Sequence, residues 1–323
     1  MGHRAERPHL SRGGNLTMSV PVTVIGGYLG AGKTTLVNRL LRQANGRRLA
    51  VLVNEFGALP IDADLIESQD DNIINIEGGC VCCSYGSDLI AGLRDLQTID
   101  AKPDHILIEA SGVALPDAIA QSVTLIAEYI VDGIIVLADA ETLRERGEDR
   151  YLSDTIRRQL AAADILLLNK TDLVNENELA QTQQWLEGQE TSARVVKTSN
   201  AEVALSAVLG PGEAENFRRL ADEAEPHAHH YTALLSVDGP VDPVGIADVL
   251  TDPHFDLIRA KGFVLGNDDT VFAVQTVGGR KDIAAHTGSP REIGQIVCIR
   301  QRGSVDTDGL QAALALVSAS PGR

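Results

Sequence analysis

The sequence predicts an α/β fold, with a mostly parallel sheet and helices on both faces, followed by a small α+β domain. Three observations lead to this fold class. Short, continuous apolar runs recur through the first part of the chain, and segments with helical spacing separate them. Polar motifs follow the ends of these runs, where open parallel sheets bind their ligands. The composition then changes over residues 211–230, which begin with Pro-Gly, continue with several acidic residues and end in a histidine cluster after Pro226.

A glycine-rich loop follows the first apolar run, residues 22–25. Residues 27–34 have the sequence GYLGAGKT, which fits the pattern G-x-x-x-x-G-K-[ST] of P-loop NTPases. Residues 35–41 continue with helical spacing, so a helix N-terminus would face the phosphates. We expect Lys33 to bridge the outer phosphates and Thr34 to hold Mg²⁺. The expected nucleotide-binding residues of this segment are Gly27, Gly30, Ala31, Gly32, Lys33, Thr34 and Thr35.

A second motif ends the apolar run at residues 105–108. Glu109 closes this run and Gly112 follows three residues later, as in a Walker B and switch II segment. The acid would act on Mg²⁺ or its water shell, and the glycine would approach the γ-phosphate. His105, at the start of the run, has no evident partner in the sequence, and we interpret it as structural. Other apolar runs predict strands at 49–54, 73–76, 133–137 and 165–168, and helices are expected over 89–96 and 156–163.

A third motif, N-K-T-D, follows the run at residues 165–168. Asn169, Lys170 and Asp172 fit the guanine-reading pattern N-K-x-D. The Asp172 carboxylate would accept two hydrogen bonds that adenine cannot supply, so GTP is the expected ligand. An ordinary Asn/Asp turn is the alternative. Residues 197–200 are a candidate for the last base-contacting loop.

Three of the four cysteines lie within four residues: Cys80, Cys82 and Cys83. Thiolates at this spacing suit Zn²⁺, Cu⁺ or Co²⁺ and disfavour Mg²⁺, whereas free thiols or a redox pair are the alternatives. Glu55, after the run at 49–54, would contact a metal or the nucleophilic water, or is a simple loop acid. Cys298 lies in an apolar strand pattern and is predicted to be buried.

The charge balance restricts the class of partner. The chain of 323 residues has 28 basic and 45 acidic side chains, a net charge of −17. This balance argues against nucleic acid or an anionic membrane as the main partner. No apolar run is long enough to span a bilayer and no signal peptide is visible, so we expect a cytoplasmic protein.

Four segments are expected. Residues 1–18 are expected to form a disordered tail. We take Met18 as the biological start, which makes the piece before it an upstream-start artefact or a mobile tail, and a short basic partner-binding arm is the alternative. Residues 19–210 form the nucleotide-binding domain. Residues 211–230 form a linker whose His227, His229 and His230 are either solvated or an auxiliary metal-capture site. Residues 231–318 form the α+β domain. Its expected strands are 231–237, 262–265, 270–277 and 293–300, and its expected helices are 242–250 and 308–317.

Six segments of this chain together form a recognisable set. They are VIGGYLGAGKTT at 24–35, NEFG at 54–57, GGCVCC at 78–83, EASG at 109–112, NKTD at 169–172 and RAKGF at 259–263. The set resembles the CobW-type GTPases, in the group that also holds the urease and hydrogenase accessory GTPases UreG and HypB. The resemblance covers about residues 19–305. Two departures are Ala58, where many relatives have Glu, and a much shorter histidine tract before the C-terminal domain.

The resemblance implies slow GTP hydrolysis coupled to delivery of a transition metal, with GTP, Mg²⁺ and Zn²⁺ or Co²⁺ as ligands. The implied metal ligands are Cys80, Cys82 and Cys83, with Thr34 on Mg²⁺. The implied catalytic residues are Lys33, Thr34, Glu55 and Glu109, and Gly112, Asn169, Lys170 and Asp172 complete the nucleotide site. The implied partner is a client metalloprotein, and a homodimer is left open.

The order of these motifs suggests a switch. We expect the γ-phosphate to order the Glu55 and Glu109–Gly112 loops, to close the cysteine site between them, and to release it on hydrolysis. No Gln directly follows Gly112, so we expect slow turnover that a partner or dimerisation would raise. The alternatives are a metal buffer with structural nucleotide, an activator of one metalloenzyme such as nitrile hydratase or the cobalamin pathway, and a small-molecule kinase.

Overall fold

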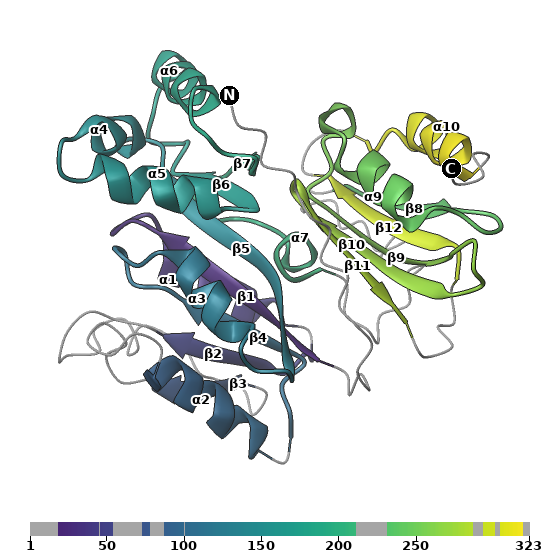
Figure 1. The fold of residues 1–323 in the computed structure, drawn as a ribbon. Helices are drawn as coiled ribbons and strands as arrows, with labels where there is room; N and C mark the ends of the chain where they lie inside the picture. Colours follow the sequence, from purple (N-terminus) through teal and green to yellow (C-terminus); the bar gives the residue numbers. More distant parts are fainter. Residues whose placement is uncertain are drawn as a thin grey trace. The chain divides into compact units, whose positions relative to one another are not determined.

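The computed structural model describes residues 19–44, 46–53, 73–77, 87–99, 101–210, 231–286, 293–300 and 304–318. Residues 73–77, 87–88 and 318 are described by their backbone alone. The chain divides between Leu209 and Gly210: one compact unit is Thr17–Leu209, and the other contains Gly210–Arg323 (Figure 1).

The first unit contains a sheet of seven strands in the order β3-β2-β4-β1-β5-β6-β7. Every neighbouring pair is parallel, which confirms the predicted fold class. The strands are β1 (Val20–Gly27), β2 (Leu49–Val53), β3 (Ile73–Glu77), β4 (His105–Glu109), β5 (Tyr129–Asp139), β6 (Ile165–Asn169) and β7 (Arg194–Lys197). Because all seven run the same way, their carboxyl ends lie at one edge of the sheet.

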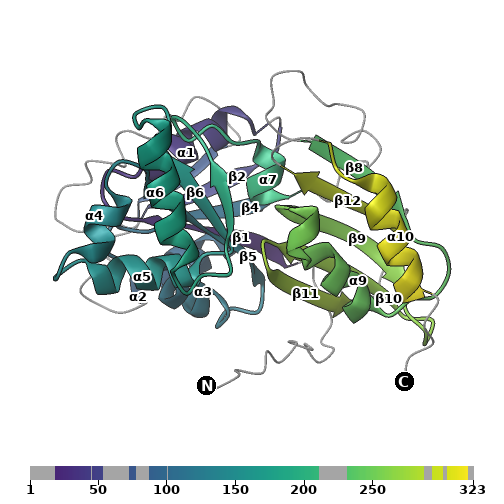
Figure 2. The same cartoon turned by 90° about the horizontal axis from the view of Figure 1, so that it is seen from above.

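Helices cover both faces of this sheet. Figure 2 shows α1 (Lys33–Arg42) on one side, and α2 (Ser87–Gln97), α3 (Pro116–Val123) and α5 (Ser153–Ala162) on the other. Alternate residues of β1 and β4, such as Val24 and Ile108, join Leu93 of α2 and Leu160 of α5 in one buried cluster. The remaining described helices of the unit are α4 (Leu143–Glu148), α6 (Glu176–Glu187) and α7 (Leu205–Leu209).

One polar cluster is buried within this sheet. The Thr23 hydroxyl lies 2.8 Å from Nε2 of His105 and donates to Oδ2 of Asp132 across 3.4 Å. All three residues are at most 5% exposed. Asp132 falls where the pairing of β1 with β5 shifts by one residue, so it is the extra residue of a β-bulge. His105 is structural, as expected, and its partners lie on β1 and β5, which is why they were not evident from the sequence.

The second unit contains an antiparallel sheet in the order β11-β10-β9-β12-β8. Helices α9 (Pro243–Thr251) and α10 (Thr307–Ser318) pack on one face, where Ile246 and Leu314 join Val264 and Ile296 in a second core. The predicted α+β architecture is confirmed, although β11 was not predicted. The strands are β8 (Tyr231–Ser236), β9 (Arg259–Leu265), β10 (Val271–Val277), β11 (Arg280–Ala285) and β12 (Gln295–Arg300), with a short 3₁₀ turn at Pro253–Phe255.

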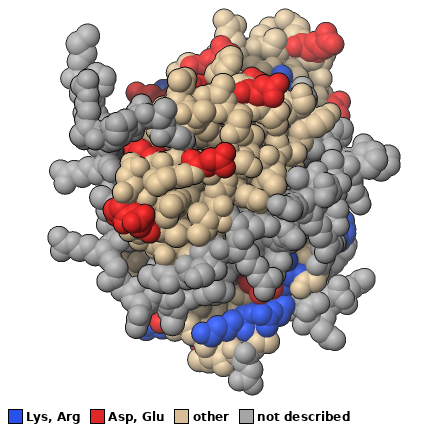
Figure 3. Space-filling model, turned by 90° about the vertical axis from the view of Figure 1, so that its right-hand side faces the viewer, with Lys and Arg blue, Asp and Glu red and all other residues tan. Residues whose placement is uncertain are grey.

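The surface reflects the excess of acidic residues. On the face in Figure 3, described acidic side chains are scattered over a mostly uncharged surface, and described basic side chains form no broad patch. Within the described ranges, no helix combines the length and the apolar character that a bilayer crossing requires.

Candidate nucleotide-binding site

The glycine-rich loop joins the end of β1 to the start of α1. Gly27, Gly30 and Gly32 have φ angles of +128°, +79° and +104°, a region in which residues with a Cβ atom are strained. A Cβ atom on Gly27 would collide with the carbonyl oxygen of Leu137 in β5, and one on Gly32 would lie 2.6 Å from Nδ2 of Asn169. The glycines therefore allow the loop to pack against the ends of β5 and β6. Lys33, the first residue of α1, is 9% exposed.

Thr34 and Glu109 meet beside this loop. The Thr34 hydroxyl donates to Oε1 of Glu109 across 2.8 Å, and Glu109 is 3% exposed. The sheet places Glu109 between Ile25 of β1 and Val53 of β2. Oxygen ligands of this kind fit Mg²⁺: the Thr34 oxygen keeps lone pairs for a cation while its O–H donates to the Glu109 carboxylate. A magnesium ion bound with nucleotide would neutralise charge on the phosphates.

Gly112 brings the segment after Glu109 against the glycine-rich loop. A Cβ atom on Gly112 would lie 2.8 Å from the backbone nitrogen of Leu29 and would collide with that side chain. The buried Gln159 of α5 also contacts this segment. Its Nε2 donates hydrogen bonds to the carbonyl oxygens of Gly112 (3.2 Å) and Ala114 (2.9 Å). The segment is thus fixed between the loop and α5.

Asn169 fastens three loops together. Its Nδ2 donates to the Ala31 carbonyl across 2.9 Å, and its Oδ1 accepts from the Ala201 N–H across 2.8 Å. The side chain is 2% exposed. Thr171 adds a second tie to the last loop, since its N–H and its hydroxyl both donate to the Thr198 carbonyl. Its predicted role in reading guanine stays a prediction, and these contacts show in addition that Asn169 braces the candidate phosphate loop against the candidate base loop.

Lys170 and Asp172 lie further out on the same loop. Lys170 has φ of +62°, and its Nζ donates to Oδ2 of Asp139 across 2.7 Å. Asp139, at the end of β5, is only 5% exposed, so it is a well-shielded anchor for this cation. Asp172 is exposed, as a residue that must reach a ligand would be. Sequence reasoning missed Asp139, although an acid at the carboxyl end of an apolar run was a usable signal.

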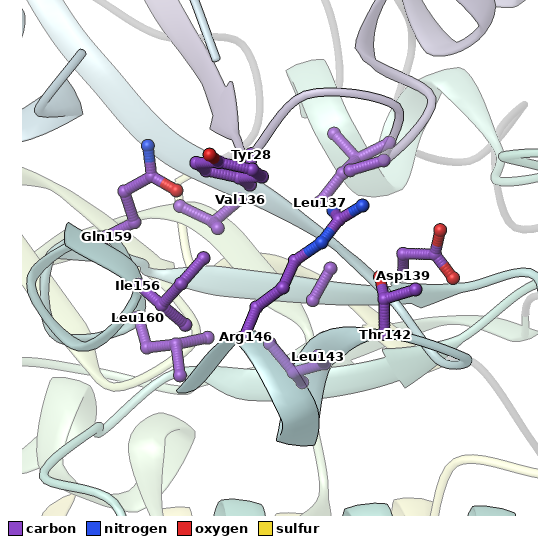
Figure 4. A pocket seen from close by; sticks show the side chains of 12 residues that line it. Tyr28, Val136, Leu137, Asp139, Thr142, Leu143, Arg146, Ile156, Gln159 and Leu160 are labelled. Carbon is purple, nitrogen blue, oxygen red and sulfur yellow. The ribbon is translucent and has the colours of Figure 1, made fainter. Parts of the chain in front are cut away.

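A hollow lies beside the loop, between β5, α4 and α5 (Figure 4). Tyr28 covers it, and the Arg146 guanidinium from α4 lies 5.0 Å from the centre of the Tyr28 ring. Nη1 of Arg146 also donates to the Leu29 carbonyl across 3.0 Å. Apolar side chains such as Val136 and Ile156 line the rest. Arg146 and Gln159 had no sequence signal, because their partners are a ring and backbone carbonyls far along the chain.

Some predicted residues lie outside the described ranges. They are Glu55, Cys80, Cys82, Cys83, His227, His229 and His230, together with the tail at 1–18 and the linker at 211–230. Their roles stay predictions. Within the described part of the chain, no group of three or more His, Cys, Asp or Glu side chains could hold a metal ion.

Two family models match the chain. Residues 21–197 match the description "CobW/HypB/UreG, nucleotide-binding domain". The chain belongs to the CobW/HypB/UreG family. Residues 232–317 match "Cobalamin synthesis protein cobW C-terminal domain", so both units have counterparts in CobW proteins. The resemblance seen in the sequence motifs is confirmed.

Curated relatives of this CobW-family chain are named for zinc. The zinc chaperone CobW of Sinorhizobium sp is 31% identical over 307 residues, which cover 81% of this chain and 86% of that protein. The zinc chaperone YjiA of Escherichia coli K12 is 36% identical over 167 residues, 49% of this chain and 52% of that one. Among solved structures, the Zn(II)-bound YjiA GTPase from E. coli has a TM-score of 0.42 at 22% identity, covering 93% of this chain and 99% of that chain.

Proposed function

We propose that this protein is a GTP-dependent zinc chaperone that hydrolyses GTP slowly and delivers its metal to a client metalloprotein. Co²⁺ is the alternative cargo. The observation that carries the proposal is the contact of Thr34 with Glu109, 2.8 Å long, beside a loop that Asn169 ties to the N-K-T-D segment. The residues predicted to bind phosphate, Mg²⁺ and the base thus lie at one edge of one sheet.

Guanine is favoured over adenine by the N-K-T-D loop. Lys170 is held by Asp139, and Thr171 by Thr198, so the loop is held at the two positions before Asp172. A loop held in advance loses little conformational entropy on binding, and the carboxylate that it presents would discriminate strongly against a base that cannot satisfy it.

The topology supports a coupled metal site. β3 ends at Glu77, three residues before Cys80 in the sequence, and β2 ends at Val53, two residues before Glu55. Both strands run parallel to β1 and β4, so β2 and β3 end at the edge that holds the glycine-rich loop. A γ-phosphate bound there would act at the same edge as the strand end that precedes the cysteine segment, with β2 and β4 between β3 and β1.

A competition titration tests the proposal. Zn²⁺ and Co²⁺ are titrated against a chelator in the presence of Mg²⁺ with a GTP analogue, Mg²⁺ with GDP, or no nucleotide. We expect affinity at least tenfold higher with the GTP analogue, about 1.4 kcal/mol of coupling, and loss of tight binding when Cys80, Cys82 and Cys83 are replaced by Ser. Cys298→Ala is the matched control and should bind as the wild type does, since Cys298 is buried in β12.

Other outcomes assign other functions. Equal affinity in all three nucleotide states would identify a metal buffer with structural nucleotide. Tight binding that survives the triple substitution would place the metal elsewhere. Phosphoryl transfer from GTP to a small molecule rather than to water would identify a kinase. The client protein and the cytoplasmic location stay predictions from the sequence.

A further inference from the structure

We propose that Arg146 and Gln159 are positioning residues for GTP hydrolysis, which hold the glycine-rich loop and the Gly112 segment in fixed relation to each other. The inference rests on the proposed GTPase function. It assigns roles to two side chains on α4 and α5 that no sequence motif includes and that flank the hollow in Figure 4.

Arg146 fixes the outer part of the glycine-rich loop. Its guanidinium lies over the Tyr28 ring, 5.0 Å from the centroid, and Nη1 donates to the Leu29 carbonyl across 3.0 Å. A cation over an aromatic ring and a charged hydrogen bond to a carbonyl are both favourable, and one planar group makes both. Two successive loop residues are therefore held by one side chain of α4.

Gln159 fixes the segment that faces this loop. Its side chain is 2% exposed, and its Nε2 donates to the carbonyl oxygens of both Gly112 and Ala114. A buried amide that joins two carbonyls restricts the backbone between them, because loss of the donor would leave both acceptors without that hydrogen bond in a buried place.

The two held segments touch each other. Gly112 lies so close to Leu29 that a Cβ atom there would be 2.8 Å from the Leu29 nitrogen. Arg146, Leu29, Gly112 and Gln159 therefore form a closed ring of contacts, and the pairing of α4 with α5 completes it. The ring determines how far the Gly112 backbone lies from the phosphate loop, and hydrolysis is sensitive to such distances.

Loss of Arg146 and loss of Gln159 should affect nucleotide binding in different ways. The glycine-rich loop surrounds the phosphates that GDP and GTP share, so loss of Arg146 should weaken both nucleotides. Gly112 would meet only the γ-phosphate, so loss of Gln159 should leave GDP binding unchanged while it weakens GTP binding and slows turnover. A purely structural role would lower the melting temperature without this split.

The experiment measures affinity for GDP and for the slowly hydrolysed analogue GTPγS, together with kcat and KM for GTP. We expect Gln159→Met to lower kcat and GTPγS affinity about tenfold and to keep GDP affinity within twofold. We expect Arg146→Met to weaken GDP and GTPγS alike by about tenfold, and Arg146→Lys, which keeps a cation over the ring, to recover part of the loss. Thermal unfolding is followed for every variant.

Two matched controls and three outcomes decide the question. Arg144→Met and Gln189→Met should behave as wild type. Arg144 lies on the same helix as Arg146 but is bonded to Gln181 of α6, and Gln189→Met loses an amide bonded to the Trp185 carbonyl.

Wild-type values in Gln159→Met and Arg146→Met would overturn this inference alone. A wild-type protein that neither binds nor hydrolyses GTP would overturn the proposed function with it. If Gln159→Met does not fold, the two Arg146 variants decide.

Discussion

The glycines of the phosphate loop differ in what surrounds them. Gly30 and Gly32 both have positive φ, yet nothing lies within 4 Å of a Cβ atom on Gly30, whereas one on Gly32 would be 2.6 Å from Nδ2 of Asn169. Gly30→Ala should therefore cost only backbone strain, about 1 kcal/mol. Gly32→Ala should also displace Asn169 from Ala31, and so lower GDP affinity about thirtyfold or more. Fluorescent GDP titration measures both; equal affinities would contradict the argument.

Asp139 should matter for nucleotide affinity although it belongs to no motif. Asp139→Asn removes the charge that holds Lys170 Nζ at 2.7 Å, and the partner is left as an unpaired cation. We expect GDP affinity to fall about tenfold, measured by calorimetry. Asp154→Asn is the matched control: Asp154 pairs with Arg158 on the surface at 3.9 Å, and such pairs contribute little. An equal effect of the two substitutions would refute the role of Asp139.

Sequence reasoning found the site residues whose chemistry is local. Thr34 and Glu109 belong to motifs at strand ends, and the structure brings their side chains together. Arg146 and Gln159 could not be found this way, because an arginine over a ring and an amide on two carbonyls depend on how α4 and α5 pack. Asn169 was found, but its bonds to Ala31 and Ala201 required the coordinates.

Helices and strands also divide into those that the sequence predicted and those that it missed. The parallel strands are buried on both faces, so β4 and β6 contain the apolar runs 106–108 and 165–168, which the sequence shows directly. β11 was missed because its sequence, RKDIAA, is charged and lies at a sheet edge. α6 was missed although Asn175 and Glu178 form a capping box, a signal that was present in the sequence.

Strand β12 offers a test at the scale of one element. It pairs with β8 and β9 on its two sides, and burial raises the pKa of its Cys298 thiol to about 12. A raised pKa means that the folded state keeps the proton, so the thiolate needed for alkylation is scarce at pH 8. In the variant with Ser at positions 80, 82 and 83, iodoacetamide should label Cys298 at least about a hundredfold more slowly in native protein than in urea.

The pH dependence of stability has a definite sign at this thiol. Below the pKa of the Cys298 thiol in the unfolded chain, the thiol is protonated in both states, so it does not lower the free energy of unfolding there. As the pH rises from about 9 towards 12, the unfolded thiol ionises first and the folded state loses stability. Urea midpoints should fall less over this range in Cys298→Ala than in its parent; parallel curves would show that β12 does not shield the thiol.

At the scale of the molecule, the two units have separate cores. The buried cluster around Val24 and Leu160 shares no residue with the cluster around Val264 and Leu314. Every described residue of the candidate nucleotide site lies in Thr17–Leu209. A fragment of residues 18–209 should therefore fold and bind GDP within about threefold of the full chain. Fluorescent GDP titration and circular dichroism check this; a folded fragment with more than tenfold weaker binding would contradict it.

The buried cluster of Thr23, His105 and Asp132 has a consequence for how the chain selects its pairing during folding. β1, β4 and β5 present similar rows of Val, Ile and Leu, which by themselves distinguish poorly between correct and slipped alignments. If the pairing register slipped by one residue, Thr23 and Asp132 would face the apolar layer on the other side of the sheet. Burying the Asp132 carboxylate there without a partner would cost several kcal/mol. These few polar atoms therefore destabilise intermediates with slipped strands, which hydrophobic contacts alone would tolerate.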